Sequence, residues 1–333
     1  DRGLNIQAGA FTVYDQGQLI ITDTVGVGLY TNGGAVTNVE NVTISNTGSY
    51  GIQLGKGTFT GKNITVDGAK NENGSIGAGT DANGTFENLA ITNGAAPNDI
   101  DMWTSAKILV KNSVLNKPVR VKGADSQLRV AESIQASVVF FDKTNLNVIG
   151  ALSADSKLVL DWDSVSHLPT DRVAVEFLTA EGEKDTAAWT DCKDNLSKIE
   201  LAVNTAAAYD LFYYEADATI WLAPKFVTNE TDLGIFLRIA ELKGEKDVIV
   251  PITKTDLLTM IGTCMALAGT SVTAAEASAP GEFSITGTGN VGGTEMGGLW
   301  TAAQLAEHTA LASISASADT TAGYFSKDDG RFN

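Results

Sequence analysis

The chain has 333 residues, a formal net charge of −17 and 34 glycines. A chain this acidic is repelled by phosphate backbones and anionic lipids, which argues against a nucleic-acid-binding protein. Hydrophobic residues make up 43% of the chain, which argues against disorder, whereas aromatic residues make up 7%, which argues against a globular enzyme with a thick aromatic core.

Short pairs of apolar residues, each flanking one other residue, recur through the first half of the chain. Such alternation predicts a half-buried strand, and its recurrence at about 20 residues predicts one strand-bearing unit per coil of a solenoid. The pairs are Leu19/Ile21, Val42/Ile44, Ile64/Val66, Leu89/Ile91, Ile108/Val110, Leu128/Val130, Leu146/Val148 and Leu158/Leu160. We expect this apolar ladder to face inward, with Ile64 and Val66 buried and Thr65 outside or in a lateral stack.

A second set of apolar segments precedes the ladder strands. It comprises Gly28-Leu-Tyr30, Gly51-Ile-Gln-Leu54 and Ile76-Gly-Ala-Gly79, with Val36, Phe59 and Phe86 between the two sets. Asn46, Gly68 and Asn93 close three ladder strands, and both residue types tolerate the positive φ of a sharp corner. We expect these three residues to stack in one line from coil to coil.

The frames Gly51-Ile-Gln-Leu54 and Asn63-Ile-Thr-Val-Asp-Gly68 are typical of the right-handed parallel β-helix proteins that bacteria secrete. The first 160 residues resemble, more narrowly, β-helical adhesins and autotransporter passengers. The resemblance implies an all-β, right-handed, single-stranded parallel β-helix of the pectin-lyase-like kind, secreted or on the bacterial cell surface. The same fold carries lyases, hydrolases, tailspikes and adhesins, so it does not specify a function.

We predict three regions. Residues 1–150 form the coils, and residues 151–225 form a strand-rich cap. The cap would cover the open end of the β-helix with antiparallel strands at 157–162, 172–178, 198–203, 209–214 and 219–222. Residues 226–333 form a C-terminal segment with a short capping helix.

The C-terminal segment opens with helix signals. Asn229 or Thr231 as N-cap and Gly244 as the stop predict a helix at about 231–242, with Leu233, Phe236, Leu237 and Ala240 on its apolar face. We predict that the helix covers the start of a second β-helix, whose strands begin at residue 247 and continue at 284–286 and 313–315. The alternative is a small α/β module with helices at 256–268 and 301–312.

Four residues are candidates for polysaccharide cleavage. Arg120-Val-Lys122 resembles the R-I-K motif of polygalacturonase-like β-helices, and Asp99 and Asp101 resemble the paired carboxylates that glycoside hydrolysis needs. The G-H-G motif of that group does not occur in the chain. The competing interpretation places both aspartates in a solvated turn and Arg120 and Lys122 on an outer face.

Asp161 and Asp163 are candidates for a calcium ion or a sugar hydroxyl, because they flank Trp162 on one short strand. The competing interpretation is an exposed strand face on which Trp162 covers the end of the β-helix. No cofactor other than such a Ca²⁺ ion is expected.

These observations favour a non-catalytic, adhesin-like module that binds a host or matrix glycan or protein, or acts as a stalk. We expect a monomer that neither binds nucleic acid nor inserts into a membrane. One alternative is a polysaccharide lyase or glycoside hydrolase. The other is a segment of a phage tailspike or fibre, which would form trimers along its coils.

Overall fold

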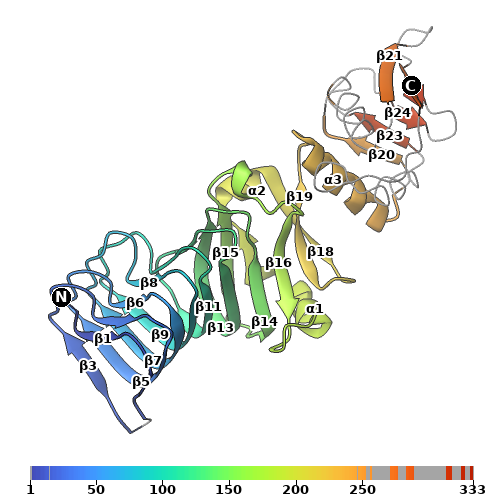
Figure 1. Cartoon of the computed structure of the whole chain (residues 1–333). Coiled ribbons are helices and arrows are strands. Elements are labelled where there is room, and N and C mark those ends of the chain that lie inside the picture. The colour runs from blue at the N-terminus through green and yellow to red at the C-terminus, as the bar shows by residue number, and fades with distance from the viewer. Residues whose placement is uncertain are drawn as a thin grey trace. The chain divides into compact units, whose positions relative to one another are not determined.

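The computed structural model describes residues 2–14, 16–245, 247–252 and 256, and the backbone of five later strands. The chain forms two compact units. The first comprises residues 1–169, 173–205 and 213–221, and the second comprises residues 170–172, 206–212 and 222–333. Strands make up 47% and helices 13%, and the parallel strands stack as a β-solenoid of about seven turns (Figure 1), which confirms the predicted fold class.

Each coil of the solenoid contributes to up to three parallel sheets. The short-strand sheet contains β1 (Leu4–Ile6), β4 (Leu29–Thr31), β6 (Ile52–Leu54), β8 (Ile76–Ala78), β10 (Ile100–Met102) and β12 (Val119–Val121), continued by the ends of β13 (Gln127–Phe140) and β15 (Lys157–Trp162). The middle sheet contains β2 (Ala10–Thr12), the first parts of β5 (Ala35–Ser45), β7 (Gly57–Asp67), β9 (Ala82–Thr92), β11 (Lys107–Val114) and β13, then β14 (Leu146–Leu152) and β16 (Val173–Leu178). The ladder sheet contains β3 (Leu19–Thr22) and the second parts of β5, β7 and β9.

The ladder sheet has the predicted register. Ile64 and Val66 are 1% and 0% exposed, whereas Thr65 between them is half-buried on the outer side. The predicted corner line is also confirmed. The N–H of Asn46 donates to the carbonyl of Asp67, and the N–H of Gly68 donates to that of Thr92, each at 3.0 Å. Asn46, Gly68 and Asn93 all have positive φ, as a sharp corner requires.

The prediction of one ladder is wrong after Ile91. Ile108 and Val110 pair with Gly84 and Phe86 in the middle sheet, not with the pair Leu89/Ile91. The inward position next to Leu89 is taken by Ser113, whose Oγ accepts a hydrogen bond from the N–H of Leu89 at 3.0 Å. In this coil, a serine therefore occupies the ladder-sheet position that was expected to be apolar. The apolar pair Ile108/Val110 lies in the middle sheet instead.

Val36 does not face the core, unlike Phe59 and Phe86, which also lie between the two sets of apolar segments. It is 43% exposed, and its neighbour Thr37 faces the core beside Phe59. The rings of Phe59 and Phe86 lie inside the coils, with their centroids 5.1 Å apart.

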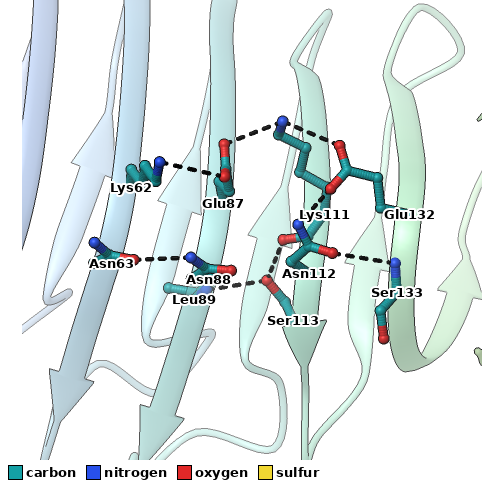
Figure 2. A network of polar contacts seen from close by, with 10 residues as sticks. All are labelled: Lys62, Asn63, Glu87, Asn88, Leu89, Lys111, Asn112, Ser113, Glu132 and Ser133. Atoms are coloured by element: carbon teal, nitrogen blue, oxygen red, sulfur yellow. Dashed lines mark hydrogen bonds and ion pairs between the residues drawn. The ribbon is translucent and has the colours of Figure 1, made fainter. Parts of the chain in front are cut away.

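A corner rich in asparagine, which we call the Asn corner, joins the middle and ladder sheets. Asn41, Asn63 and Asn88 each have a φ near +55°, which bends the long strands there. The Nδ2 of Asn63 donates to the Oδ1 of Asn41 at 3.1 Å, and that of Asn88 donates to the Oδ1 of Asn63 at 2.8 Å. In the following coil, Asn112 donates to the Glu132 carboxylate and accepts from the N–H of Ser133 (Figure 2).

Coils continue beyond residue 150. Strands β15, β16 and β17 (Ile199–Leu201) still pair in parallel with earlier coils. Antiparallel pairing, which was predicted throughout this region, is found between β16 and β19 (Thr219–Pro224). The region also contains β18 (Tyr209–Tyr214), α2 (Val203–Ala208), and two 3-10 turns, η1 (Val165–His167) and η2 (Leu196–Lys198).

Helix α1 (Thr186–Asp194) was not predicted from the sequence. Asp185 caps it, because its Oδ1 accepts from the N–H of Ala188 at 2.9 Å. Trp189, a residue of this helix, is buried and donates from its indole nitrogen to the carbonyl of Thr219 at 2.9 Å. The closing cap expected at residues 151–225 stays a prediction.

Helix α3 (Glu230–Leu242) in the second unit was predicted. Asn229 caps it through a 2.9 Å hydrogen bond from the N–H of Asp232, and Gly244 follows its end with a φ of +74°. Leu233, Leu237 and Ala240 are buried as expected, whereas Phe236 is only half-buried. The helix packs on β20 (Asp247–Val250).

The second unit also holds a sheet of mixed direction. Strand β20 pairs in parallel with β23 (Ser313–Ala316). The other described pairings are antiparallel and involve β21 (Ser271–Glu276), β22 (Phe283–Thr288), β24 (Tyr324–Ser326) and β25 (Arg331–Phe332). The helices predicted at 256–268 and 301–312 lie outside the described residues, apart from residue 256, so the second β-helix and the α/β module both stay predictions.

Candidate ligand-binding site

One row of outward-facing residues runs along the short-strand sheet, one residue from each coil. In Cα register it contains Asn5, Tyr30, Gln53, Gly77, Asp101, Arg120, Val139 and Asp161. Neighbours such as Ile100 and Met102 face the core and are fully buried. The sheet therefore places Asp101, Arg120 and Asp161, which the sequence suggested as parts of two sites, on one face.

Asp101 and Arg120 form an ion pair on adjacent strands. Arg120 Nε donates to Asp101 Oδ1 at 2.7 Å, and Arg120 Nη2 donates to Asn73 Oδ1 at 2.9 Å. Asp101 is only 4% exposed, so it does not lie in a solvated turn. Burial, and next the negative charge of Asp101, raise the pKa of the nearby Tyr50 hydroxyl to about 12.

Two aromatic rings lie beside this ion pair, over Gly77. The rings of Tyr50 and Trp103 are 6.0 Å apart, and a Cβ at residue 77 would lie 2.9 Å from each of them. Glycine is therefore required at this position of the row, because any side chain would displace the rings. Tyr50 is buried, whereas Trp103 is half-buried.

Residues that follow the short strands form a second row beside the first. The N–H groups of Trp103, Lys122 and Phe141 donate to the carbonyls of Ala78, Met102 and Val121, which places them on successive coils. The Lys122 ammonium lies 5.8 Å from the centre of the Phe141 ring. We call the surface of Tyr50, Asp101, Trp103, Arg120, Lys122 and Phe141 the aromatic shelf.

The shelf continues towards Asp163. The ring of His167 lies 6.4 Å from that of Phe141, and its Nδ1 lies 3.7 Å from an Asp163 carboxylate oxygen. Asp163 is exposed. Lys122 and Asp163 thus border the same surface, although the sequence suggested separate sites for them.

Asp99 does not belong to the shelf. Its Oδ2 accepts from the backbone N–H of Lys117 at 2.9 Å, while Lys117 Nζ donates to the carbonyls of Gly94 and Ala96. Burial raises the pKa of the Asp99 carboxyl. Asp99 therefore fastens a loop, and neither it nor Asp101 is exposed enough to flank a glycosidic bond, as hydrolysis would require.

Asp161 is bound within the chain, because its Oδ1 accepts from Thr205 Oγ1 at 2.6 Å and from the N–H of Trp162 at 3.1 Å. Trp162 faces the core and stacks on Phe140 at 5.0 Å, so it is no platform between the two aspartates. In the described part of the chain, no group of three or more histidine, cysteine, aspartate or glutamate side chains is arranged to hold a metal ion. The calcium site stays a prediction.

Tyr50, Asn73 and Trp103 were not identified from the sequence as site residues. One signal was present, because Asn73 and Trp103 belong to the two longest turns of the repeat, at 68–76 and 93–103. Long turns of a solenoid gather on one face, so they point to the surface where a ligand would bind.

No family model, curated protein or solved structure matches the chain. None of the helices in the described residues has the length and apolar character that crossing a membrane requires.

Proposed function

We propose that the chain is a non-catalytic, adhesin-like β-solenoid module of a secreted or cell-surface bacterial protein, and that its aromatic shelf binds a glycan. The half-buried Trp103 ring beside the fixed Asp101–Arg120 pair carries this proposal. An aromatic face accepts the apolar C–H face of a sugar ring, and fixed polar groups beside it select the hydroxyls.

The rigidity of the shelf supports binding. Arg120 is held by Asp101 and Asn73, and the Trp103 ring packs against Tyr50 over Gly77. Side chains that are ordered before the ligand arrives lose little conformational entropy on binding, which favours affinity. The parallel strands beneath the shelf add to this order, because they fix the spacing of successive coils at about 4.8 Å.

A pectin-lyase-like lyase or hydrolase is the second candidate, favoured by the proximity of Asp101 to the Arg120-Val-Lys122 segment. Both Asp99 and Asp101 are already hydrogen-bonded within the chain, which is why binding without cleavage is preferred. A tailspike segment, the third candidate, predicts a trimer in solution.

The test is a glycan array followed by titration of the strongest carbohydrate hit. We expect Trp103→Ala to weaken binding about tenfold, as the loss of one stacking contact predicts. Tyr14→Ala is the matched control, because Tyr14 is 77% exposed and lies outside the shelf. Equal affinity of the Trp103→Ala variant would overturn the proposal, and release of new reducing ends from the bound glycan would replace it with the enzyme candidate.

A further inference from the structure

An open groove of about 550 Å³ lies at the corner between the short-strand and middle sheets. Its lining comes from three consecutive coils and contains Asp81, Ala82, Asn83, Ser105, Lys107, Ala124, Asp125 and Gln127. None of these residues belongs to the aromatic shelf.

The solenoid repeat builds the groove. Asn83, Lys107 and Gln127 are Cα partners on β9, β11 and β13, so their exposed side chains form a row with a spacing of about 4.8 Å. Asp81 and Ser105 lie in the preceding turns with φ values of +58° and +60°. The groove is therefore a row of amide and ammonium groups bordered by tight turns.

The polar side chains of the groove are not used by the fold. In the described part of the chain, no side-chain hydrogen bond or ion pair is made by the five polar residues Asn83, Ser105, Lys107, Asp125 and Gln127. Asp81 forms a 3.7 Å ion pair with Lys56, in which both side chains are more than half exposed. Donors and acceptors from three coils are thus open to a ligand.

The groove begins where the aromatic shelf ends. Trp103 is two residues before Ser105, and Lys122 is three residues before Asp125. The indole of Trp103 extends back over Gly79, where a Cβ would lie 2.5 Å from Nε1, and Gly79 is two residues before Asp81. A chain of sugars stacked on Trp103 can therefore pass around this corner.

We propose that the groove is a second subsite for the same glycan, a neutral oligosaccharide that stacks on Trp103 and continues across the corner. This inference rests on the proposed carbohydrate-binding function. Asn83, Lys107 and Gln127 would hydrogen-bond successive hydroxyls, since amides and an ammonium offer both donors and acceptors of suitable reach. Asp81 and Asp125 outnumber Lys107 in the lining, so an anionic sugar chain would be repelled.

The experiment measures affinity against chain length by calorimetry, using mono-, di-, tetra- and hexasaccharides of glucose, galactose and mannose. We expect wild-type affinity to rise about tenfold from the monosaccharide to the tetrasaccharide, equivalent to about one well-made subsite. Combined replacement of Asn83, Lys107 and Gln127 by alanine should abolish that rise and leave monosaccharide affinity unchanged. Asn38→Ala, an exposed middle-sheet residue outside the groove, should change neither.

Two results would overturn the inference while leaving the proposed function intact. One is an affinity that depends on Trp103 but not on chain length. The other is an unchanged chain-length dependence in the triple variant. Failure of all these neutral sugars to bind the wild-type chain would also overturn this inference, whereas the proposed function is overturned by a glycan array on which no carbohydrate binds. Circular dichroism of each variant checks that the coils are unaltered.

Discussion

The two corners that flank the middle sheet use the same residue types in opposite ways. Strand β9 carries Asn83 in the groove and Asn88 in the Asn corner, and β11 carries Lys107 in the groove and Lys111 in the Asn corner. Asn88 and Lys111 bond to neighbouring coils, whereas Asn83 and Lys107 have no side-chain partner among the described residues.

The Asn corner also alternates in charge along the axis. Lys62 lies 3.8 Å from Glu87, Glu87 lies 3.1 Å from Lys111, and Lys111 lies 3.2 Å from Glu132 (Figure 2). The hydrogen bond to Glu87 is the main cause that raises the pKa of Lys111. A polar side chain of the solenoid thus stabilises the fold where a neighbouring coil supplies a hydrogen-bond or ion-pair partner. Where no neighbouring coil supplies a partner, the side chain is available to a ligand.

The largest loss of stability is expected when an ion pair that is buried within the chain is broken. In the second unit, Arg172 contacts Asp232 Oδ1 from Nε at 3.0 Å and from Nη2 at 2.9 Å, and Tyr209 Oη donates to Asp232 Oδ2 at 3.0 Å. Asp232→Ala would remove the carboxylate that accepts hydrogen bonds from the buried Arg172 guanidinium, so we expect a loss of about 3–5 kcal/mol in unfolding free energy. Thermal and urea unfolding measure it.

The control in the same unit is Asp210→Ala. Asp210 pairs with Lys225 at 3.1 Å, but its side chain is 70% exposed, so the loss should stay below about 1 kcal/mol. Equal effects of the two substitutions would contradict the reasoning that burial makes the Arg172–Asp232 pair critical.

The comparison between the corners is tested directly on β9. Asn88→Ala removes the hydrogen bond to Asn63 and places alanine at a φ of +54°, so we expect a loss of about 1–2 kcal/mol in unfolding free energy. Asn88→Gly keeps the backbone geometry and should cost less. Asn83→Ala, by contrast, should cost under about 0.5 kcal/mol, as surface substitutions usually do. A loss at Asn83 equal to that at Asn88 would show that the groove is structural.

The parallel β-solenoid was predictable because alternation and repeat length are local signals. Ile64 and Val66 lie where the repeat placed them, facing the core. The register failed at Ser113, where a buried hydroxyl satisfies a backbone N–H and replaces the apolar signal. Helix α1 was missed because tertiary packing of Trp189 outweighs a weak local pattern.

The site was predictable in part. Asp101, Arg120 and Lys122 were singled out and lie on one surface, as does the border residue Asp163. The partners Tyr50 and Asn73 could not be found, because their proximity depends on how turns from different coils fold over the short-strand sheet. Sequence spacing alone does not give that geometry.

The pH dependence of stability should differ between a carboxylate that accepts side-chain hydrogen bonds, Asp67, and one that is buried, Asp99. Hydrogen bonds from Thr92, and then from Asn93, lower the pKa of Asp67 below its ordinary 3.8, so its contribution is lost as pH falls below that value. Burial raises the pKa of Asp99 above 3.8, so stability is gained as pH falls towards that value.

Each aspartate is therefore replaced by asparagine and unfolding is measured across acidic pH. We expect Asp67→Asn to lose less stability than wild type on acidification, and Asp99→Asn to lose more. The two differences should fall in separate windows, below and above the ordinary carboxyl pKa of 3.8. Identical pH profiles for both variants would contradict the assignment of opposite pKa shifts.

The smallest effect should come from the two lysines of β11. Lys111→Gln removes contacts with Glu87 and Glu132 on a partly exposed surface, and we expect a loss of about 0.5–1 kcal/mol that shrinks as salt is added. Lys107→Gln breaks no contact within the described chain, so its unfolding free energy should match wild type at every salt concentration. A salt-dependent loss of unfolding free energy in Lys107→Gln would mean that the groove residues, like those of the Asn corner, stabilise the fold. It would contradict the inference that the groove side chains are free to bind a ligand.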